Sequence, residues 1–235
     1  MKKQPVIKNQ DSHRTVLWAW ERPEDLRFID KASTGVAFLA QTLVLYDDRV
    51  VRIPRRQPLN VSDGTYLIAV SRIETNKTGN TPELSSHQRH ELVAQIKKSL
   101  ELPDVKAIQL DFDVTTSERK FYRQLILELR REIPKDFPLT ITALGSWCID
   151  DRWFGDLPID EAVPMVFDMG KDDRLIRSYL AKGLDWKEPL CRGSYGLSVD
   201  QNIDAALRKD RRVFYFNSRP WKRSALESLE DNKQL

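Results

Sequence analysis

The sequence predicts an α/β protein whose parallel strands close into a (β/α)8 barrel. Apolar runs rich in β-branched and aromatic residues recur along the 235 residues, and amphipathic helical stretches lie between several of them. Alternation of strands and helices indicates parallel strands, and near-continuous apolar runs fit a sheet covered on both faces. Barrels of this class usually take about 200 to 400 residues. We therefore expect a compact TIM barrel in which some helices are irregular or missing.

The expected strands are apolar runs that each end on a polar or aromatic residue. They are 15–20, 34–48 with a hairpin extension at 49–59, 65–74, 105–113, 138–147, 161–168, a weaker 190–198, and 211–218.

Helices are expected between several of these strands, at 81–102, 117–133, 172–183 and 199–210. The second begins with Ser117, a suitable N-cap, and has Glu118 in its first turn. The third ends on Gly183, a residue suited to the C′ position. After the first, second and fifth strands little helical sequence is left, so those connections are expected to be short or irregular.

An open, doubly wound sheet is the main alternative fold. Such sheets usually carry a glycine-rich phosphate turn, G-x-G-x-x-G or G-x-x-x-x-G-K, and this sequence has neither. We therefore favour the barrel, with three segments: a flexible N-terminal tail over 1–14, a single barrel domain over 15–218 and a polar C-terminal tail over 219–235.

Composition limits the classes of partner. The net charge is only +3 with both signs interleaved, which does not favour nucleic acid. No run approaches the ~20 apolar residues of a membrane span. The start of the chain is basic but has no apolar core, so no secretory signal is expected. The expected location is the cytoplasm for the chain as given, or the periplasm if a leader is missing; the oligomeric state stays open.

Cysteine and histidine are scarce. Cys148 and Cys191 lie in no metal-binding pattern, and we expect two free thiols in a cytoplasmic protein, with a single disulfide as the alternative in an oxidising compartment. His87 and His90 are three residues apart on an expected helix, where a solvated surface pair is favoured over a metal site. We therefore expect neither a cofactor nor a metal site.

The strand at 105–113 raises the functional question. Side chains alternate between the faces of a strand. In a barrel, the apolar members of this strand therefore face the helices and Gln109, Asp111 and Asp113 face the lumen. The carboxyl end of a barrel strand is where active sites lie, so the two aspartates are candidate catalytic groups. The structural alternative is that Asp111 bonds a neighbouring strand and Asp113 caps the next helix.

Other strand ends also carry functional side chains. They are Trp18, Trp20 and Glu21 at the first strand, Arg72 and Glu74 at the third, Ser146 and Trp147 at the fifth, Asp168 at the sixth, and Tyr195 and Asn217 at the last two. Carboxylates, amides and arginine suit sugar hydroxyls, and indoles suit the C–H faces of sugars. Trp18, Trp20 and Trp147 are either a sugar platform or core residues, whereas the other tryptophans are expected to pack.

Several blocks resemble an uncharacterised bacterial group, domain-of-unknown-function family 3142. They are "LWAWERPEDLRFID", "GVAFLAQTL", "QLDFDVTTSERKFYRQLILELR", "ITALGSWC", "DEAVPMVFDMG" and "CRGSYGLS", spread over residues 15 to 200. That family is similar to glycosidase-type TIM barrels, and many of its members are longer, with a leader and extra carboxyl-terminal sequence. The resemblance implies the barrel but no established activity.

A more distant resemblance is to the glycoside hydrolase family 18 chitinases, which have D-x-x-D-x-D-x-E at the fourth strand and M-x-Y-D at the sixth. "DFDVT" and "MVFD" look like partial counterparts, in which Asp111 and Asp113 match the second and third aspartates and Met165 and Asp168 match the later motif. Thr115 stands where that family has its catalytic glutamate, and Phe167 stands at its tyrosine. The resemblance implies that another carboxylate (Asp113, Glu21 or Glu74) donates the proton, or that sugar is bound without being cut.

These observations lead to a hypothesis of a glycoside hydrolase-like protein that acts on a carbohydrate. Asp113 is the candidate acid/base, with Asp111 adjusting its pKa, and Asp168 and Glu21 position substrate or share the chemistry. Met165 joins Arg72, Glu74 and the aromatic strand-end residues as a binding candidate. The alternatives are an inactive carbohydrate-binding barrel, a divalent-metal hydrolase that uses Asp111, Asp113 and Glu74, and a regulatory or assembly protein. Convergence of the four candidate carboxylates on one cleft would favour the hydrolase.

Overall fold

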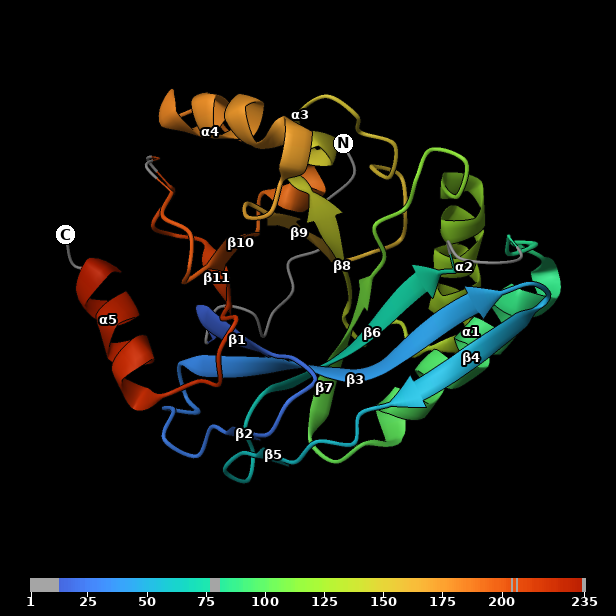
Figure 1. Cartoon of the computed structure of the whole chain (residues 1–235), viewed down its shortest axis with the longest axis horizontal. Coiled ribbons are helices and arrows are strands. Elements are labelled where there is room, and N and C mark those ends of the chain that lie inside the picture. Colours follow the sequence, from blue (N-terminus) through green and yellow to red (C-terminus); the bar gives the residue numbers. More distant parts are fainter. Residues whose placement is uncertain (1–12, 77–80, 204, 206, 234–235) are drawn as a thin grey trace.

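Eight parallel strands close into a barrel (Figure 1), as a computed structural model that describes residues 13–76, 81–203, 205 and 207–233 shows. The strand order is β1-β11-β10-β9-β8-β7-β6-β3, and pairing of β1 with β3 closes the ring. The predicted fold class, a (β/α)8 TIM barrel with irregular or missing helices, is confirmed.

The barrel strands lie within the predicted runs, except that β6 extends one residue beyond the run 65–74. They are β1 (Thr15–Ala19), β3 (Thr34–Tyr46), β6 (Leu67–Thr75), β7 (Val105–Asp111), β8 (Leu139–Leu144), β9 (Glu161–Met165), β10 (Ser194–Ser198) and β11 (Arg212–Phe216). The predicted hairpin extension is β4 (Arg49–Pro54), which pairs antiparallel with β3. A separate two-stranded ladder joins β2 (Glu24–Asp25) and β5 (Leu59–Asn60).

The helices are unevenly distributed around the barrel. They are α1 (Ser86–Lys97), α2 (Arg119–Glu132), α3 (Gly145–Ile149), α4 (Asp173–Ala181) and α5 (Arg223–Lys233), with 3-10 turns η1 (Lys98–Glu101), η2 (Gly170–Asp172) and η3 (Pro189–Cys191). Between β1 and β3, and again between β3 and β6, the described chain has strands and turns instead of helices. Short or irregular connections were predicted after both of these strands, because little helical sequence follows them.

The predicted helix over 199–210 is wrong for the part of it that the structure describes. The side chains there bond to strand ends. Asp200 accepts a 3.0 Å bond from the backbone of Ser218, and Gln201 bonds Asp168. These tertiary bonds fix the segment in a turn conformation. Residues 204 and 206 lie outside the described residues.

The start of α2 also differs from the prediction. Ser117 does not cap the helix, because its hydroxyl lies 3.0 Å from the hydroxyl of Thr115. The Glu118 side chain instead turns back and accepts 2.6 and 2.8 Å bonds from the backbone and hydroxyl of Thr115. The Glu118 side chain thus returns to the residue three positions earlier, as the glutamate of a capping box does, and the regular helix begins at Arg119.

The outer core lies between the sheet and α1 and α2. Ile108 and Leu110 of β7 are fully buried there against apolar residues of both helices, including Leu92 and Leu125. The helices present one apolar stripe each, which buries against the strands. This packing fixes the face of β7, so that the alternate residues must point into the barrel.

The barrel interior is packed, not hollow, below the carboxyl-terminal end. Its apolar lining is Val16, Trp18, Ala37, Ile68, Val70, Ala107, Val163 and Phe214. Gln109 accepts a 2.9 Å bond from the indole Nε1 of Trp18. Near the amino-terminal end, Arg212 forms a buried ion pair with Glu161. A filled interior leaves only the rim of strand ends open for a ligand.

The cysteines are paired, and the expectation of two free thiols is wrong. Cys148 of α3 and Cys191 of η3 form a disulfide with a Cα–Cα distance of 5.9 Å across 43 residues of sequence. The backbone already brings these segments together, since the carbonyl of Cys148 accepts 3.0 Å bonds from the amides of Lys187 and Glu188. Sequence separation alone gave no sign of this approach.

The residues after β11 include α5 and a buried anchor. The indole Nε1 of Trp221 donates a 2.9 Å bond to the carbonyl of Trp18, and Leu226 of α5 is buried. The C-terminal segment that was predicted to be a polar tail over 219–235 therefore contains side chains that pack on the barrel. None of the described helices is both long and apolar enough to cross a membrane.

Candidate functional site

Asp111 ends β7 on the lumen side, at the rim of the barrel. Its carboxyl Oδ1 accepts a 2.7 Å bond from the hydroxyl of Thr142 on β8. Arg72 of β6 lies 4.0 Å from its Oδ2, and the same guanidinium pairs with Glu74 at 2.8 Å. Asp111 therefore bonds a neighbouring strand, as the structural alternative predicted, and it also lies at the rim.

The surroundings of Asp111 favour its neutral form. Burial raises the pKa of this carboxyl to about 6, and the negative charges of Asp113 and Glu74 act in the same direction. The bond from Thr142 and the charge of Arg72 lower the pKa but do not offset burial. A carboxyl with a pKa of about 6 is one that acid/base chemistry near neutral pH could use.

Asp113 lies where two hollows of the rim meet. One hollow of about 400 Å³ is also lined by Val44, Arg72, Glu74 and Asp111. The other, of about 330 Å³, is lined on its far side by residues of the β8 and β9 ends. Asp113 contributes to both, and its side chain is exposed. A ligand that occupied both hollows would pass over this carboxylate.

Glu118 is a further carboxylate of the first hollow, and it is not among the residues predicted from the sequence. Its Oε2 is held by the backbone and hydroxyl of Thr115, and the residue is 9% exposed. Thr115 stands at the position of the glutamate in the D-x-x-D-x-D-x-E motif. A T-x-x-E spacing is the signal that could have located Glu118, because such a side chain returns to the residue three positions before it.

The second hollow is lined by both apolar and charged residues. Met165 ends β9, and Phe167 follows it and stacks on Phe216 with ring centroids 5.4 Å apart. Trp20, half-buried, meets Phe216 edge-on at 6.2 Å. These rings pack against the apolar interior of the barrel, and of them only Phe167 lines the second hollow, beside the charged residues Asp113, Asp168, Lys171 and Asp172.

Asp168 lines the second hollow, but from an exposed turn. Its backbone has a positive φ of 50°. It forms a reciprocal pair with Gln201, whose side-chain oxygen accepts from the Asp168 amide at 3.3 Å while its side-chain amide donates to the Asp168 carboxylate. Of the four predicted catalytic carboxylates, Asp111, Asp113 and Asp168 thus line two hollows that share Asp113.

Glu21 does not line either hollow. It is exposed, and its carboxylate accepts a 3.3 Å bond from the backbone amide of Arg56, in the segment that follows β4. Asn217 is likewise engaged locally, since it is 5% exposed and its side-chain oxygen accepts from the amide of Arg219 at 2.9 Å. The structure therefore places both at strand ends but away from Asp113.

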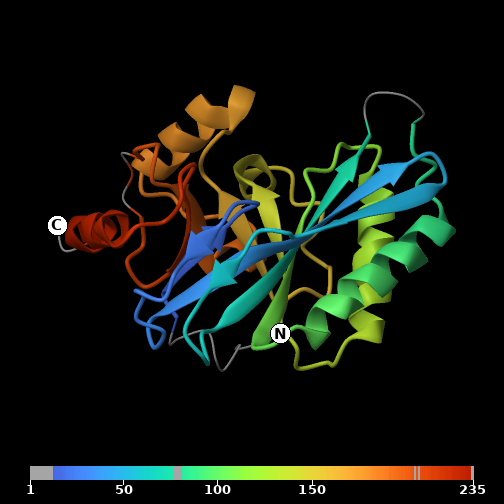
Figure 2. The same ribbon diagram turned by 60° about the horizontal axis from the view of Figure 1, so that its bottom comes forward.

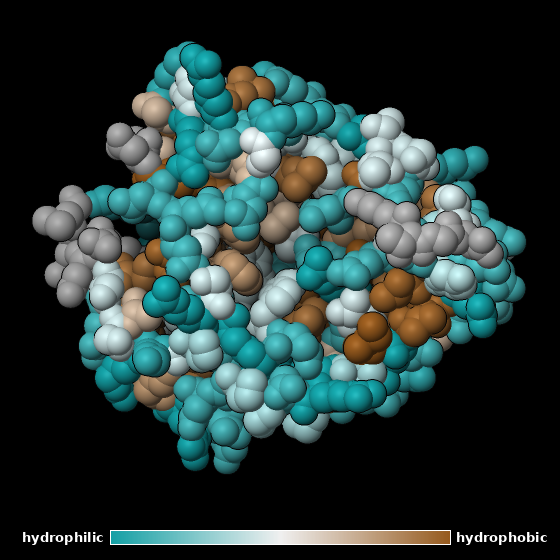
Figure 3. All heavy atoms as spheres, viewed as in Figure 1, coloured by the Kyte–Doolittle hydropathy of each residue, from teal (hydrophilic) through white to brown (hydrophobic). Residues whose placement is uncertain are grey.

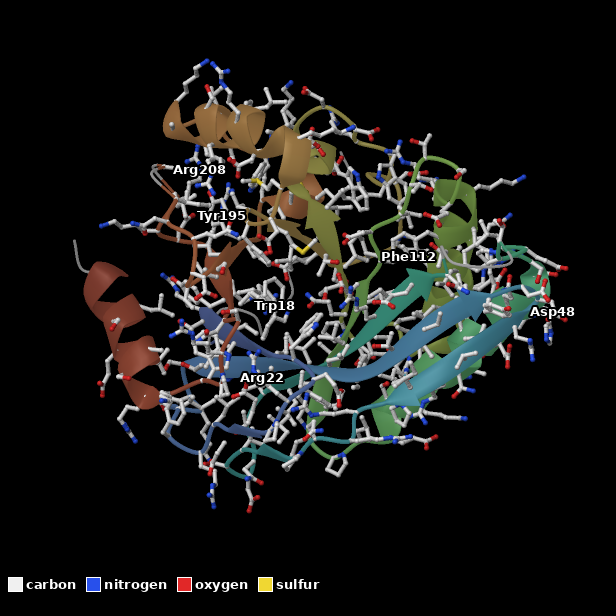
Figure 4. The ribbon with its side chains drawn as sticks, in the orientation of Figure 1. Trp18, Arg22, Asp48, Phe112, Tyr195 and Arg208 are labelled. Atoms are coloured by element: carbon white, nitrogen blue, oxygen red, sulfur yellow. A yellow bond between two sulfur atoms is a disulfide. The ribbon has the colours of Figure 1, made fainter. Side chains whose placement is uncertain are left out.

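Three aromatic candidates are buried elsewhere. Trp18 lies in the middle of the barrel, only 2% exposed, whereas Tyr195 faces the outer layer beside Trp186 (Figure 4). The hydroxyl of Tyr195 accepts a 3.1 Å bond from Arg211. Trp147 is 3% exposed because β8 ends at Leu144, which places this tryptophan in α3 within the outer core. None of the three lines the hollows of Asp113.

The described residues contain no group of three or more His, Cys, Asp or Glu arranged to hold a metal ion. Asp111, Asp113 and Glu74, the set required by the metal-dependent alternative, therefore form no preformed ligand cluster. Arg72 pairs with two of these carboxylates, Glu74 at 2.8 Å and Asp111 at 4.0 Å.

No family model matches the chain, and no curated protein matches it significantly. Solved structures do. A family GH18 chitinase from Chromobacterium violaceum superposes with a TM-score of 0.53 at 10% identity, over 88% of this chain and 78% of that one.

Two further solved structures are less similar. The spore cortex-lytic enzyme SleL of Bacillus cereus has a TM-score of 0.49 at 14% identity, over 80% of this chain and 51% of that one. The chitinase domain of the spore coat protein CotE of Clostridium difficile has a TM-score of 0.44 at 10% identity, over 72% and 54%. The superposition on the Chromobacterium violaceum chitinase agrees with the TIM-barrel fold of this chain.

Proposed function

We propose that the chain is a glycoside hydrolase-like protein that acts on a carbohydrate at the two hollows joined by Asp113. The observation that supports the proposal is that this carboxylate lines both the first hollow, here called the charged hollow, and the second, each of which has charged and apolar lining residues. Sugar rings offer both hydroxyls and apolar C–H faces, so a row of sugar units suits such a cleft. The fold supports the same class, since it is similar to that of a chitinase.

The proposed chemistry needs two groups with different protonation. Glycoside cleavage uses a carboxylic acid at the leaving oxygen and a second carboxylate or base near the anomeric centre. Asp113 is the proposed acid/base, because it borders both hollows. Asp111, with its pKa raised to about 6, is proposed to exchange a proton with it. Glu118, fixed by Thr115, is the third carboxylate within the charged hollow.

The remaining predicted residues divide between two proposed roles. Arg72, Glu74, Met165 and Asp168 line the hollows and are proposed to contact substrate. We now propose structural roles for the other candidates, since their contacts lie within the barrel, its outer core or the adjacent loops. Of these, Glu21 was predicted to be catalytic, and Trp18, Trp20, Trp147, Tyr195 and Asn217 were predicted to bind substrate.

An inactive carbohydrate-binding barrel is the second candidate function. It is supported by Thr115, which stands where the resemblance to family 18 places the catalytic glutamate. In this candidate the hydroxyl and amide of Thr115 serve only to orient Glu118, and the cleft holds a glycan without cutting it. The relationship to family 3142 stays part of the proposal and is compatible with either candidate.

One experiment separates the two candidates. We would incubate the native chain with oligomers of β-linked N-acetylglucosamine, chosen because the similar structure is a chitinase, and measure both binding and release of new reducing ends. Release supports the hydrolase, and binding without release supports the inactive barrel. Neither binding nor release, with these oligomers or on a glycan array, would contradict both.

The disulfide supports a proposal about location. A bond between Cys148 and Cys191 persists in oxidising compartments and is reduced in most cytoplasms. We therefore propose that this chain works in an oxidising compartment such as the periplasm, in place of the predicted cytoplasm. Labelling of free thiols in cells, before and after reduction, would test this.

A further inference from the structure

The β3–β4 hairpin extends the sheet beyond the barrel rim. β3 has 13 residues and β6 has 9, whereas β1, β9, β10 and β11 have 5 each. The far half of β3 therefore pairs only with β6 and β4. Figure 2 shows this part of the sheet projecting beside α1, with one face covered by helices.

The two faces of the hairpin have different environments. Leu43 and Leu45 of β3 are fully buried in the outer core. On the same face of β4, Val50 packs against that core and Arg52 donates a 2.6 Å bond to Gln41. Strand alternation turns the intervening residues the other way, toward the open side of the barrel.

That open face carries an exposed apolar pair. Ile53 lies opposite Thr42, and Val51 lies opposite Val44. Val51 is 49% exposed and Ile53 50% exposed, which makes them two of the few large exposed hydrophobic side chains among the described residues. Figure 3 shows hydrophobic side chains gathered over the region of β3 and β4. We call Thr42, Val44, Val51 and Ile53 the hairpin wall.

The register of the strands joins the hairpin wall to the candidate site. Thr42 lies beside Arg72, and Arg72 lies beside Asp111. A single row across four adjacent strands thus runs from Ile53 to Asp111. At ~4.8 Å per strand, this row spans roughly 14 Å. In the next row, Val51 and Val44 lie beside Glu74.

The two rows share a surface with the charged hollow. Val44 of the wall lines that hollow together with Arg72 and Glu74. The side chains of Arg72 and Glu74 are 43% and 42% exposed, and they pair with each other at 2.8 Å. The surface therefore changes from apolar at the hairpin to hydrogen-bonding at β6 and then to the carboxylates of β7.

We propose that the hairpin wall binds the outer sugar units of an extended glycan whose inner unit lies over Asp113. This inference rests on the proposed function. The C–H faces of the outer units would contact Val51 and Ile53, and their hydroxyls would reach Arg72 and Glu74. Continuity with the charged hollow favours a glycan over a second copy of the chain, because the same ligand then covers both surfaces.

The test compares a long and a short ligand. We would measure the affinities of the native chain and of a Val51→Thr/Ile53→Thr variant for the hexamer and the dimer of N-acetylglucosamine. The threonines retain β-branching, so the strand should be preserved. We expect the variant to bind the hexamer about fivefold more weakly, because partial apolar contacts at two residues are lost. Dimer affinity should stay unchanged.

A matched control replaces an exposed apolar residue away from the rim. Leu127 of α2 is 37% exposed, so Leu127→Gln should leave both affinities unchanged. Hexamer affinity equal to that of the native chain, or an equal loss for hexamer and dimer, would overturn the hairpin wall while leaving the proposed function intact.

Two other outcomes have separate meanings. If the native chain binds no glycan, the proposed function fails and the hairpin wall with it. A second result would be that the native chain self-associates, that the variant is monomeric, and that both bind the hexamer equally. The hairpin wall would then be an interface between copies, and the proposal would be overturned. Thermal melting of each variant verifies that the fold is retained.

Discussion

Thr142 of β8 donates a 2.7 Å hydrogen bond to Asp111 of β7, across the rim of the barrel. The bond favours the ionised carboxylate, yet burial outweighs it and raises the pKa of Asp111 to about 6. Two opposing effects therefore set the protonation of one carboxyl, and each of them is open to mutation.

The raised pKa of Asp111 predicts a dependence of stability on pH. In the unfolded chain this carboxyl titrates near 3.8, and in the folded chain near 6. Between those values the folded state holds more protons, so its contribution to stability is complete below the lower value and is lost as pH rises through the upper one. Asp111→Asn should remove this loss, a difference on the order of 2 kcal/mol between acidic and neutral pH.

The measurement is the free energy of unfolding by urea, for the native chain and the variant, from about pH 4 to about pH 7. The difference between the two curves should grow in favour of Asp111→Asn as pH rises. A difference that is independent of pH would show that Asp111 is not perturbed. All other titrating groups are common to both chains and cancel.

Thr142→Val tests the opposing effect. Removing the hydroxyl leaves Asp111 without the bond that lowers its pKa, so the pKa should rise further above about 6. The carboxyl titration of Asp111 followed by NMR would measure it, and stability should fall by about 1 kcal/mol. Thr140→Val is the control, since Thr140 bonds the carbonyl of Ile108 instead. An unchanged titration in Thr142→Val would contradict this account.

Trp18 should behave as a core residue. It is 2% exposed, and its Nε1 bonds Gln109 inside the barrel. Trp18→Ala should cost about 3–5 kcal/mol of stability through the cavity it leaves. Trp18→Phe keeps most of the ring but leaves Gln109 without this donor, at about 1–3 kcal/mol. A surface platform would instead give loss of glycan binding with unchanged urea unfolding.

The disulfide should stabilise the chain. Closing a loop of 43 residues corresponds to about 4 kcal/mol in the chain-entropy model. We expect the free energy of unfolding of the Cys148→Ser/Cys191→Ser variant to be lower by about this amount, and its melting temperature to fall accordingly. The native chain, unfolded without reductant, should show no reactive thiol. Two reactive thiols under those conditions would contradict the pairing.

The fold could be predicted because its signal is repeated along the chain. Each barrel strand is a separate apolar run, and the faces of β7 followed from alternation alone. The prediction of a helix over 199–210 was wrong because the side chains of Asp200 and Gln201 bond to neighbouring strand ends, which outweighs the helical spacing of the sequence there. Tertiary partners of this kind have no local signature.

The candidate site was only partly predictable. The alternation of side chains along β7 placed Asp111 on the lumen face. Alternation gives the face of a residue but not its depth in the barrel, so Trp18, also on the lumen face, could not be assigned to the buried interior or to a sugar platform. Trp147 depended on where β8 ends, and an error of three residues moved it into α3. Glu118 was missed because its role depends on a side chain that turns back to Thr115.

The most direct test of the account is glycan cleavage by Asp113→Asn, compared with the native chain. Asp136→Asn, at an exposed aspartate outside both hollows, is the matched control. We expect Asp113→Asn to lose release of reducing ends by at least about a hundredfold, while its thermal melt and that of the control stay unchanged. Full activity in Asp113→Asn, or loss of activity and folding together, would contradict it.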